Sequence, residues 1–178
     1  MIAGLAVSSF TAGPAFCADT ADKTETGSAH KVVIDPGHQG SWVDMSAQEP
    51  MAPGSSQTKA KATTGTQGRY TGVPEYQLNL IISLKLKEAL LERGYEVILT
   101  RNDNSDAVSN IERAQLASQE GAEVTVRIHA NGSDDTSVNG ALAMCVSPSN
   151  PYVGDLYEDS YALSEAILNQ YCVLSGFK

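Results

Sequence analysis

Residues 31–38 read KVVIDPGH, and this stretch decides how the chain is expected to fold. After Lys31 comes a run of β-branched apolar residues, which suits a strand buried on both of its faces. Pro36 and Gly37 end that run, because both residues favour turns over a continuing strand. His38 follows at once. The stretch therefore predicts a buried strand that places a histidine just beyond its carboxyl end.

Strand and helix patterns alternate along the remainder of the chain. Three helices are expected from apolar periodicity and capping signals, over residues 74–94, 109–121 and 155–174. Three further strands are expected from short apolar runs, over residues 95–100, 123–128 and 141–146. This alternation predicts an α/β fold with a mainly parallel sheet flanked by helices.

The connection between Gln39 and Val73 is long and rich in Gly, Ser, Thr, Pro and Gln. Loops of this length without structure of their own are uncommon inside compact domains and usually carry function. Trp42 lies in this connection, where an indole ring could stack on a sugar, although a lone loop tryptophan is weak evidence.

The first 30 residues differ in character from the remainder of the chain. Residues 1–18 are apolar and end in small residues, which is typical of a secretory signal peptide, although no Lys or Arg precedes Lys23. Residues 19–30 are polar and aperiodic, and they predict a flexible linker. We therefore expect a secreted, extracellular protein whose folded domain spans residues 31–178. No stretch is long and apolar enough to predict a transmembrane segment.

Composition narrows the class of partner. The chain has 178 residues, of which 42% are hydrophobic and 19% charged, an ordinary balance for one globular domain. Its formal net charge is −9, and no cluster of Lys or Arg forms a track for phosphates. These features argue against nucleic acid as a partner. They leave the oligomeric state open.

Three polar residues suggest a metal site. His38 and His129 each follow a predicted strand, and ligands of open α/β sheets bind at the carboxyl ends of the strands. Glu75, at the start of the helix after the long connection, offers a carboxylate. Two His and one carboxylate around tetrahedral Zn²⁺ leave a fourth position for water, as hydrolysis requires. The residues alone equally allow two polar histidines at the rim of a sheet, because no compact motif fixes their geometry.

Three further residues are weaker candidates for the site. Asp35 would orient a histidine ligand from behind, or would fix the Asp-Pro-Gly turn. Asn131 would contact substrate or, as we slightly prefer, stabilise the turn after its strand. Arg113 is expected to form a structural ion pair rather than to touch substrate.

Five segments, in order along the chain, carry a family resemblance: VIDPGHQG (33–40), PEYQLNL (74–80), LTR (99–101), RA (113–114) and RIHAN (127–131). Together they resemble the zinc-dependent N-acetylmuramoyl-L-alanine amidases of the "amidase 3" type. In the last segment Arg127 stands where the family more often has serine. Each match is modest alone, and five in family order are a strong signal.

The resemblance implies a fold, a metal and a reaction. The fold would be a three-layer sandwich of the phosphorylase/hydrolase type, and residues 31–178 would be the amidase catalytic domain. Zn²⁺ would be held by His38, Glu75 and His129. The reaction would be hydrolysis of the amide bond between N-acetylmuramic acid and L-alanine in peptidoglycan. The protein would then be a secreted, wall-associated hydrolase that acts in peptidoglycan catabolism.

The sequence departs from the family at its carboxyl end. The family's general-base glutamate lies on a late strand reading V-E-x-G-F, and no such segment occurs before Lys178. We therefore expect a catalytic domain incomplete at its C-terminus, with the last strand and helix missing and with little or no activity. The alternative is a non-catalytic zinc- or peptidoglycan-binding module that lacks the base. A zinc carboxypeptidase is disfavoured, because no H-x-x-E ligand pair is present.

Overall fold

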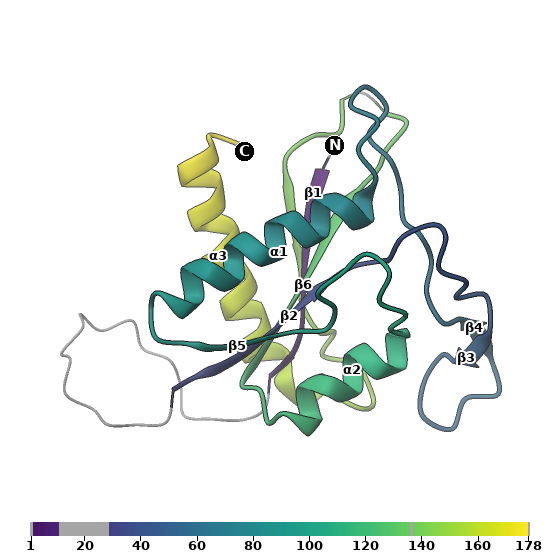
Figure 1. Cartoon of the computed structure of the whole chain (residues 1–178). Coiled ribbons are helices and arrows are strands. Elements are labelled where there is room, and N and C mark those ends of the chain that lie inside the picture. Colours follow the sequence, from purple (N-terminus) through teal and green to yellow (C-terminus); the bar gives the residue numbers. More distant parts are fainter. Residues whose placement is uncertain (1, 11–28, 136, 178) are drawn as a thin grey trace.

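The computed structural model describes residues 2–10, 29–135 and 137–177. Its centre is a sheet of five strands in the order β5-β2-β6-β1-β7 (Figure 1). The strands are β1 (Ile2–Phe10), β2 (Lys31–Pro36), β5 (Glu96–Leu99), β6 (Val124–Asn131) and β7 (Ala141–Met144). Three of the four pairings are parallel, and only β1 with β6 is antiparallel. The predicted α/β fold with a mainly parallel sheet is thus confirmed.

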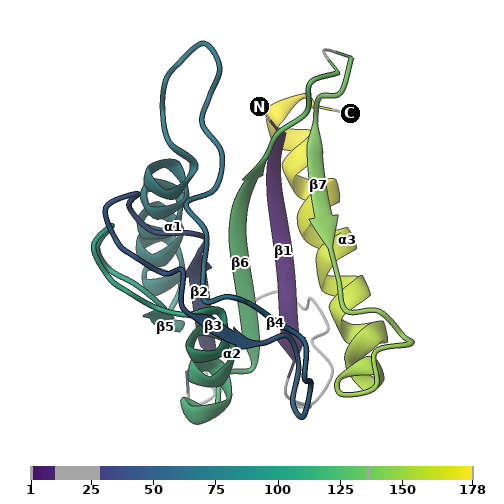
Figure 2. The same ribbon diagram turned by 90° about the vertical axis from the view of Figure 1, so that its right-hand side faces the viewer.

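Helices cover the sheet as the apolar patterns require. The helices are α1 (Glu75–Leu91), α2 (Asn110–Gln119) and α3 (Tyr157–Ser175), with a short 3-10 turn η1 (Gly154–Leu156) before α3. Figure 2 shows α1 and α3 on opposite sides of the strands β6 and β1. Helix α1 packs on β2, β5 and β6, whereas α3 packs on β7 and β1.

Strand β2 is buried on both of its faces, as the opening stretch predicts. Val32 and Ile34 point into the core beneath α1, where Ile82 and Leu86 pack. Val33, which alternates with them, packs against Ala117 of α2 and neighbouring residues. The apolar run can be continuous because no face of this strand meets water.

The long connection contains more structure than its composition indicates. Strands β3 (Gln48–Pro50) and β4 (Thr58–Ala60) pair with each other as a small antiparallel ribbon apart from the main sheet. Each strand has only three residues, too few for a periodic pattern to be read from sequence.

Residues 2–10, inside the segment predicted as a leader, form strand β1 between β6 and β7. The sequence did not predict this strand. The leader over residues 1–18 stays a prediction, and residues 11–28, with most of the predicted linker, lie outside the described residues. In this structure β1 is what connects β7 to the sheet, because β7 pairs with β1 and not with β6. No helix among the described residues is long and apolar enough to cross a bilayer.

Removal of residues 1–18 is expected to loosen one side of the domain selectively. Without β1, strand β7 loses its sheet partner, and α3 loses part of the surface on which it packs. Hydrogen exchange followed by mass spectrometry on residues 1–178 and 19–178 tests this. We expect faster exchange in β7 and α3 of the shorter chain, with β2 and α1 unchanged as internal controls. Equal protection of β7 in both chains would contradict the expectation.

Candidate functional site

The site begins at the turn that follows β2. The backbone amide of Gly37 donates to the carbonyl oxygen of Ile128 at 2.9 Å, which ties the turn to β6. A glycine is needed here, since a Cβ at this position would overlap the ring of His129. His38 then adopts a positive φ of 66°, a conformation that residues other than glycine rarely take. The strain indicates a position that the surrounding structure enforces.

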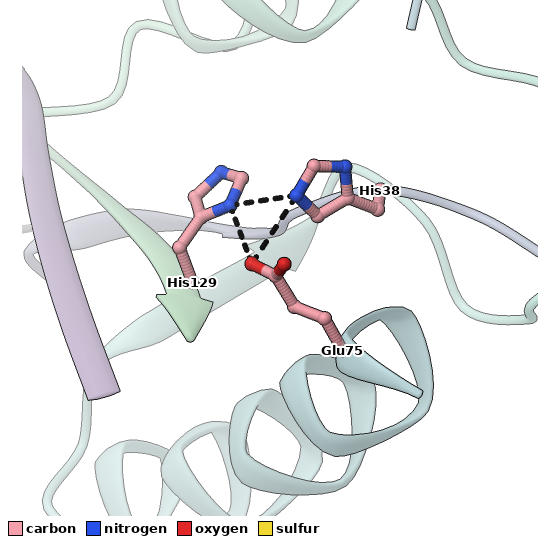
Figure 3. Close-up of side chains that lie close together, drawn as sticks. All are labelled: His38, Glu75 and His129. Atoms are coloured by element: carbon pink, nitrogen blue, oxygen red, sulfur yellow. Dashed lines mark hydrogen bonds and ion pairs between the residues drawn. The ribbon is translucent and has the colours of Figure 1, made fainter. Parts of the chain in front are cut away.

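The three predicted ligands come together (Figure 3). The Nε2 atom of His38 lies 3.2 Å from Oε1 of Glu75, and Nδ1 of His129 lies 3.0 Å from the same oxygen. The two ring nitrogens are 3.1 Å apart. His38 follows β2, His129 lies two residues before the end of β6, and Glu75 is the first residue of α1. Elements far apart in sequence thus converge at the carboxyl edge of the parallel strands.

Backbone groups of the long connection and of β6 orient the side chains of His38 and Glu75. The Nδ1 atom of His38 is 2.8 Å from the carbonyl oxygen of Thr63. Because a carbonyl can only accept, Nδ1 carries the proton and Nε2 is the nitrogen presented to the site. The backbone amides of Thr66 and Ala130 each donate to the Glu75 carboxylate at 2.9 Å.

The Glu75 carboxylate is held in its charged form. Its side chain is 5% exposed, and burial alone raises the pKa of a carboxyl group. The contacts with the His129 and His38 rings and the hydrogen bonds from the two backbone amides outweigh burial and place the pKa of Glu75 far below its ordinary value. A carboxylate that is charged at neutral pH beside two imidazoles is a donor set suited to a divalent cation.

Behind the turn lies a buried ion network centred on Asp35. Its carboxylate accepts hydrogen bonds from Arg113 at 2.6 Å, Arg127 at 2.5 Å and the Thr100 hydroxyl at 2.5 Å. Burial raises the pKa of Asp35, but the two arginines and the hydroxyl lower it by more than burial raises it. The resulting pKa is about 2. Among the described residues Asp35 makes no hydrogen bond or ion pair with either histidine, so it acts on the arginines and the turn instead.

Arg113 forms a buried ion pair with Asp35, and its structural rather than substrate-binding role stays a prediction. Besides Asp35, its guanidinium donates to the carbonyl oxygens of Val108, Pro36 and His38, and its side chain is 2% exposed. Asn131 accepts from the amide of Gly132 at 2.9 Å, in keeping with a turn role.

Arg101 is a site-building residue that the sequence analysis did not single out. It is fully buried and donates to the carbonyl oxygens of Pro36, Gly37 and Tyr76, joining the first turn to the start of α1. Burial is the main cause that lowers the pKa of Arg101, to about 10, so the guanidinium remains charged at neutral pH. Most of its partners are backbone atoms, which leave no mark in the sequence beyond the LTR segment.

Asn79 of α1, like Arg101, donates to the backbone of the turn that follows β2. Its side-chain amide donates to the carbonyl oxygen of Gly37 at 3.2 Å and lies 3.5 Å from Glu75 Oε1. Trp42 is 63% exposed. Its indole donates to Ser105 and meets the ring of Tyr76 edge-on, so it is available at the surface beside the site.

Asp35→Asn is expected to destabilise the fold strongly, because it leaves Arg113 and Arg127 without their anion. Breaking a buried ion pair of this kind costs about 3–5 kcal/mol. In the native protein the depressed pKa means that stability from Asp35 is present above pH ~4 and is lost as pH falls towards 2. Urea unfolding at several pH values measures both effects, and the variant should lack this part of the pH dependence.

The matched control is Asp44→Asn, since Asp44 is exposed and contacts only Ser46 among the described residues. It should unfold like the native protein. An Asp35→Asn variant as stable as this control would contradict the network's importance.

Comparison with known proteins agrees with this geometry. Residues 32–175 match the family model of N-acetylmuramoyl-L-alanine amidase. The apo form of the N-acetylmuramyl-L-alanine amidase Ami1 from Mycobacterium abscessus is 31% identical with a TM-score of 0.53; the match covers 58% of this chain and 49% of that one. Ami1 from Mycobacterium smegmatis is 29% identical with the same TM-score, over 60% of this chain and 49% of that one.

The chain therefore spans about half the length of these two enzymes. No match was found among curated protein sequences. The family match nevertheless covers most of the chain and contains all three converging ligands. This chain belongs to the N-acetylmuramoyl-L-alanine amidase family.

Proposed function

We propose that the chain binds one Zn²⁺ through His38, Glu75 and His129 and hydrolyses the amide bond between N-acetylmuramic acid and L-alanine in peptidoglycan. The observation that carries the proposal is the convergence of two imidazole nitrogens and one carboxylate oxygen. A protein of this family would act outside the cell at the wall, which agrees with the predicted secretion.

The donor atoms fit a zinc ion. Ligand atoms about 2.0–2.1 Å from tetrahedral zinc lie roughly 3.3 Å from one another. The three separations between the donor atoms are 3.0, 3.1 and 3.2 Å. A side chain at Gly65 would overlap both the Glu75 carboxylate and the His38 ring. The loop therefore packs directly against these two donors.

Residues around the site prepare the donor atoms for the ion. His38 keeps its proton on Nδ1 through Thr63, and Glu75 stays charged through two backbone amides, so the donors need little rearrangement on binding. When bound, zinc would lower the pKa of a water molecule and polarise the amide carbonyl. The cavity beside the ligands has a volume of about 170 Å³ and is lined by His38, His129 and part of the β4 segment.

One specific observation favours the second candidate, a zinc- or peptidoglycan-binding module without catalysis. None of the described residues that line this cavity is an Asp or a Glu. Glu75 is engaged with both histidines and two amides, which leaves it poorly placed to accept a proton from water. The proposed hydrolysis by residues 1–178 therefore lacks an evident general base.

Metal content tests the ligand assignment directly. We expect close to one zinc per chain for purified residues 1–178, measured by plasma emission spectroscopy after dialysis. His129→Ala should lose most of this zinc, because two ligands cannot hold the ion tightly. His30→Ala is the matched control, since His30 lies at the surface, pairs with Glu123 and not with any of the three donors, and should leave the zinc content unchanged. Zinc bound equally by His129→Ala would refute the assignment.

Turnover separates the two candidate functions. We expect residues 1–178 to release L-alanine amino termini from purified peptidoglycan slowly, because a missing general base costs about 10²–10⁴-fold in rate. Amino-terminal labelling of the digest measures the release, with His129→Ala as the background. Zinc binding with no release above that background would favour the binding module. Fast release, at the rate of a complete family enzyme, would show that another group supplies the base.

A further inference from the structure

The cavity beside the metal ligands has a charge opposite to that of the protein. The chain carries a net charge of −9, yet the described residues lining this cavity include Lys59, Arg113 and Arg127 and no carboxylate. Asp35 behind the cavity and Glu75 beside the two histidines carry two negative charges against these three positive ones. An excess of positive charge in one small cavity of an acidic protein favours an anionic ligand there.

The three cations differ in how many of their hydrogen-bond donors are unused. Arg113 is buried, and its guanidinium already donates hydrogen bonds to Asp35 and to backbone carbonyl oxygens. Arg127 uses only Nε, towards Asp35, and its side chain is 28% exposed. No hydrogen bond from its two terminal nitrogens is found among the described residues. Lys59, on β4, is exposed and forms no ion pair with any residue that the structure describes. Arg127 and Lys59 are therefore available to a ligand.

Arg127 also stands at a defined distance from the metal ligands. Arg127 and His129 are two residues apart in β6, so their side chains leave the same face of the strand about 6.6–6.8 Å apart. Both residues line the same cavity. Two residues of an extended peptide span about 6.6–7.2 Å. A peptide lying along β6 with its first residue beside His129 would therefore have its second residue beside Arg127.

We propose that Arg127, assisted by Lys59, binds the free α-carboxylate of the second stem-peptide residue, D-glutamate. This inference rests on the proposed function and names a substrate preference of that site. In peptidoglycan D-glutamate continues the stem through its γ-carboxyl, which leaves the α-carboxyl either free or amidated. A carboxylate accepts two parallel bonds from a guanidinium, whereas a carboxamide offers one acceptor and turns two donors towards the cations. Arg127 is a specificity-determining residue, and the unamidated stem is preferred.

Binding of two dipeptides tests the preference without requiring turnover. L-Ala-D-Glu and L-Ala-D-isoglutamine differ only in the α-carboxyl group, and titration calorimetry of residues 1–178 with each, in the presence and absence of zinc, gives the ratio of affinities. We expect the acid to bind about tenfold or more tightly, as charge-assisted bidentate pairs imply. Equal affinities, or no binding of either dipeptide, would overturn the proposal.

Substitutions of the cationic residues show which side chain causes the preference for the acid dipeptide. Arg127→Ser should abolish the ratio while retaining circular dichroism and zinc content. Because Arg127 also pairs with Asp35, Lys59→Ala provides a second variant outside that network, and it should reduce the ratio in part. Lys61→Ala is the matched control, since this lysine carries the same charge two residues away and does not line the cavity. An unchanged ratio in folded Arg127→Ser and in Lys59→Ala would refute the subsite.

The outcome is distinguishable from failure of the proposed function. Absence of zinc in residues 1–178 would refute the metal assignment, while the dipeptide ratio without zinc would still report on Arg127. Zinc binding and slow hydrolysis with no dipeptide preference would leave the function standing and remove only the subsite.

Discussion

The parallel pairing of β2 with β6 is the constraint on which the site depends. Asp35 lies opposite Arg127 and Pro36 opposite Ile128 in this ladder. The next residues of the two strands therefore emerge at the same edge, which brings His38 beside His129 although 91 positions separate them. A shift of one residue would turn His129 to the other face of β6, because side chains alternate along a strand. The buried apolar face of each strand holds the register, so core packing and ligand geometry are set together.

Buried charge secures the turn that follows this ladder. Arg101 and Arg113 direct their guanidinium groups at the backbone carbonyls of Pro36, Gly37 and His38, which no secondary structure would otherwise satisfy. Asp35 supplies the negative charge that allows Arg113 to remain buried. This arrangement holds His38 in a left-handed conformation that its own side chain disfavours. The same network leaves one arginine, Arg127, only partly used at the cavity wall, so the structural support of the turn and the proposed recognition of substrate share one carboxylate.

The other half of the domain depends on strand β1. Strand β7 and helix α3 pack on β1, which lies between them and the half of the sheet that holds His38 and His129. The central position of a sheet usually carries strongly apolar residues, and residues 2–10 are apolar for a second reason, since such composition also predicts a leader. Composition alone cannot separate these two roles, because burial in a sheet and passage through a secretion channel select the same residues.

The order of the α/β elements could be predicted from the sequence, since continuous β-branched runs, helical periodicity and capping residues such as Ser109 are local signals that tertiary packing preserved. His38, Glu75 and His129 could also be singled out as candidates, because a strand end and a helix start are visible from local pattern. That these three side chains meet depends on long-range strand pairing, which no local pattern encodes. The structure also revealed the buried roles of Arg101 and Asn79, which donate to backbone carbonyls distant in sequence. It placed β1 in the sheet, and it placed Lys59 and Arg127 on one cavity, because no spacing along the chain encodes these long-range neighbours.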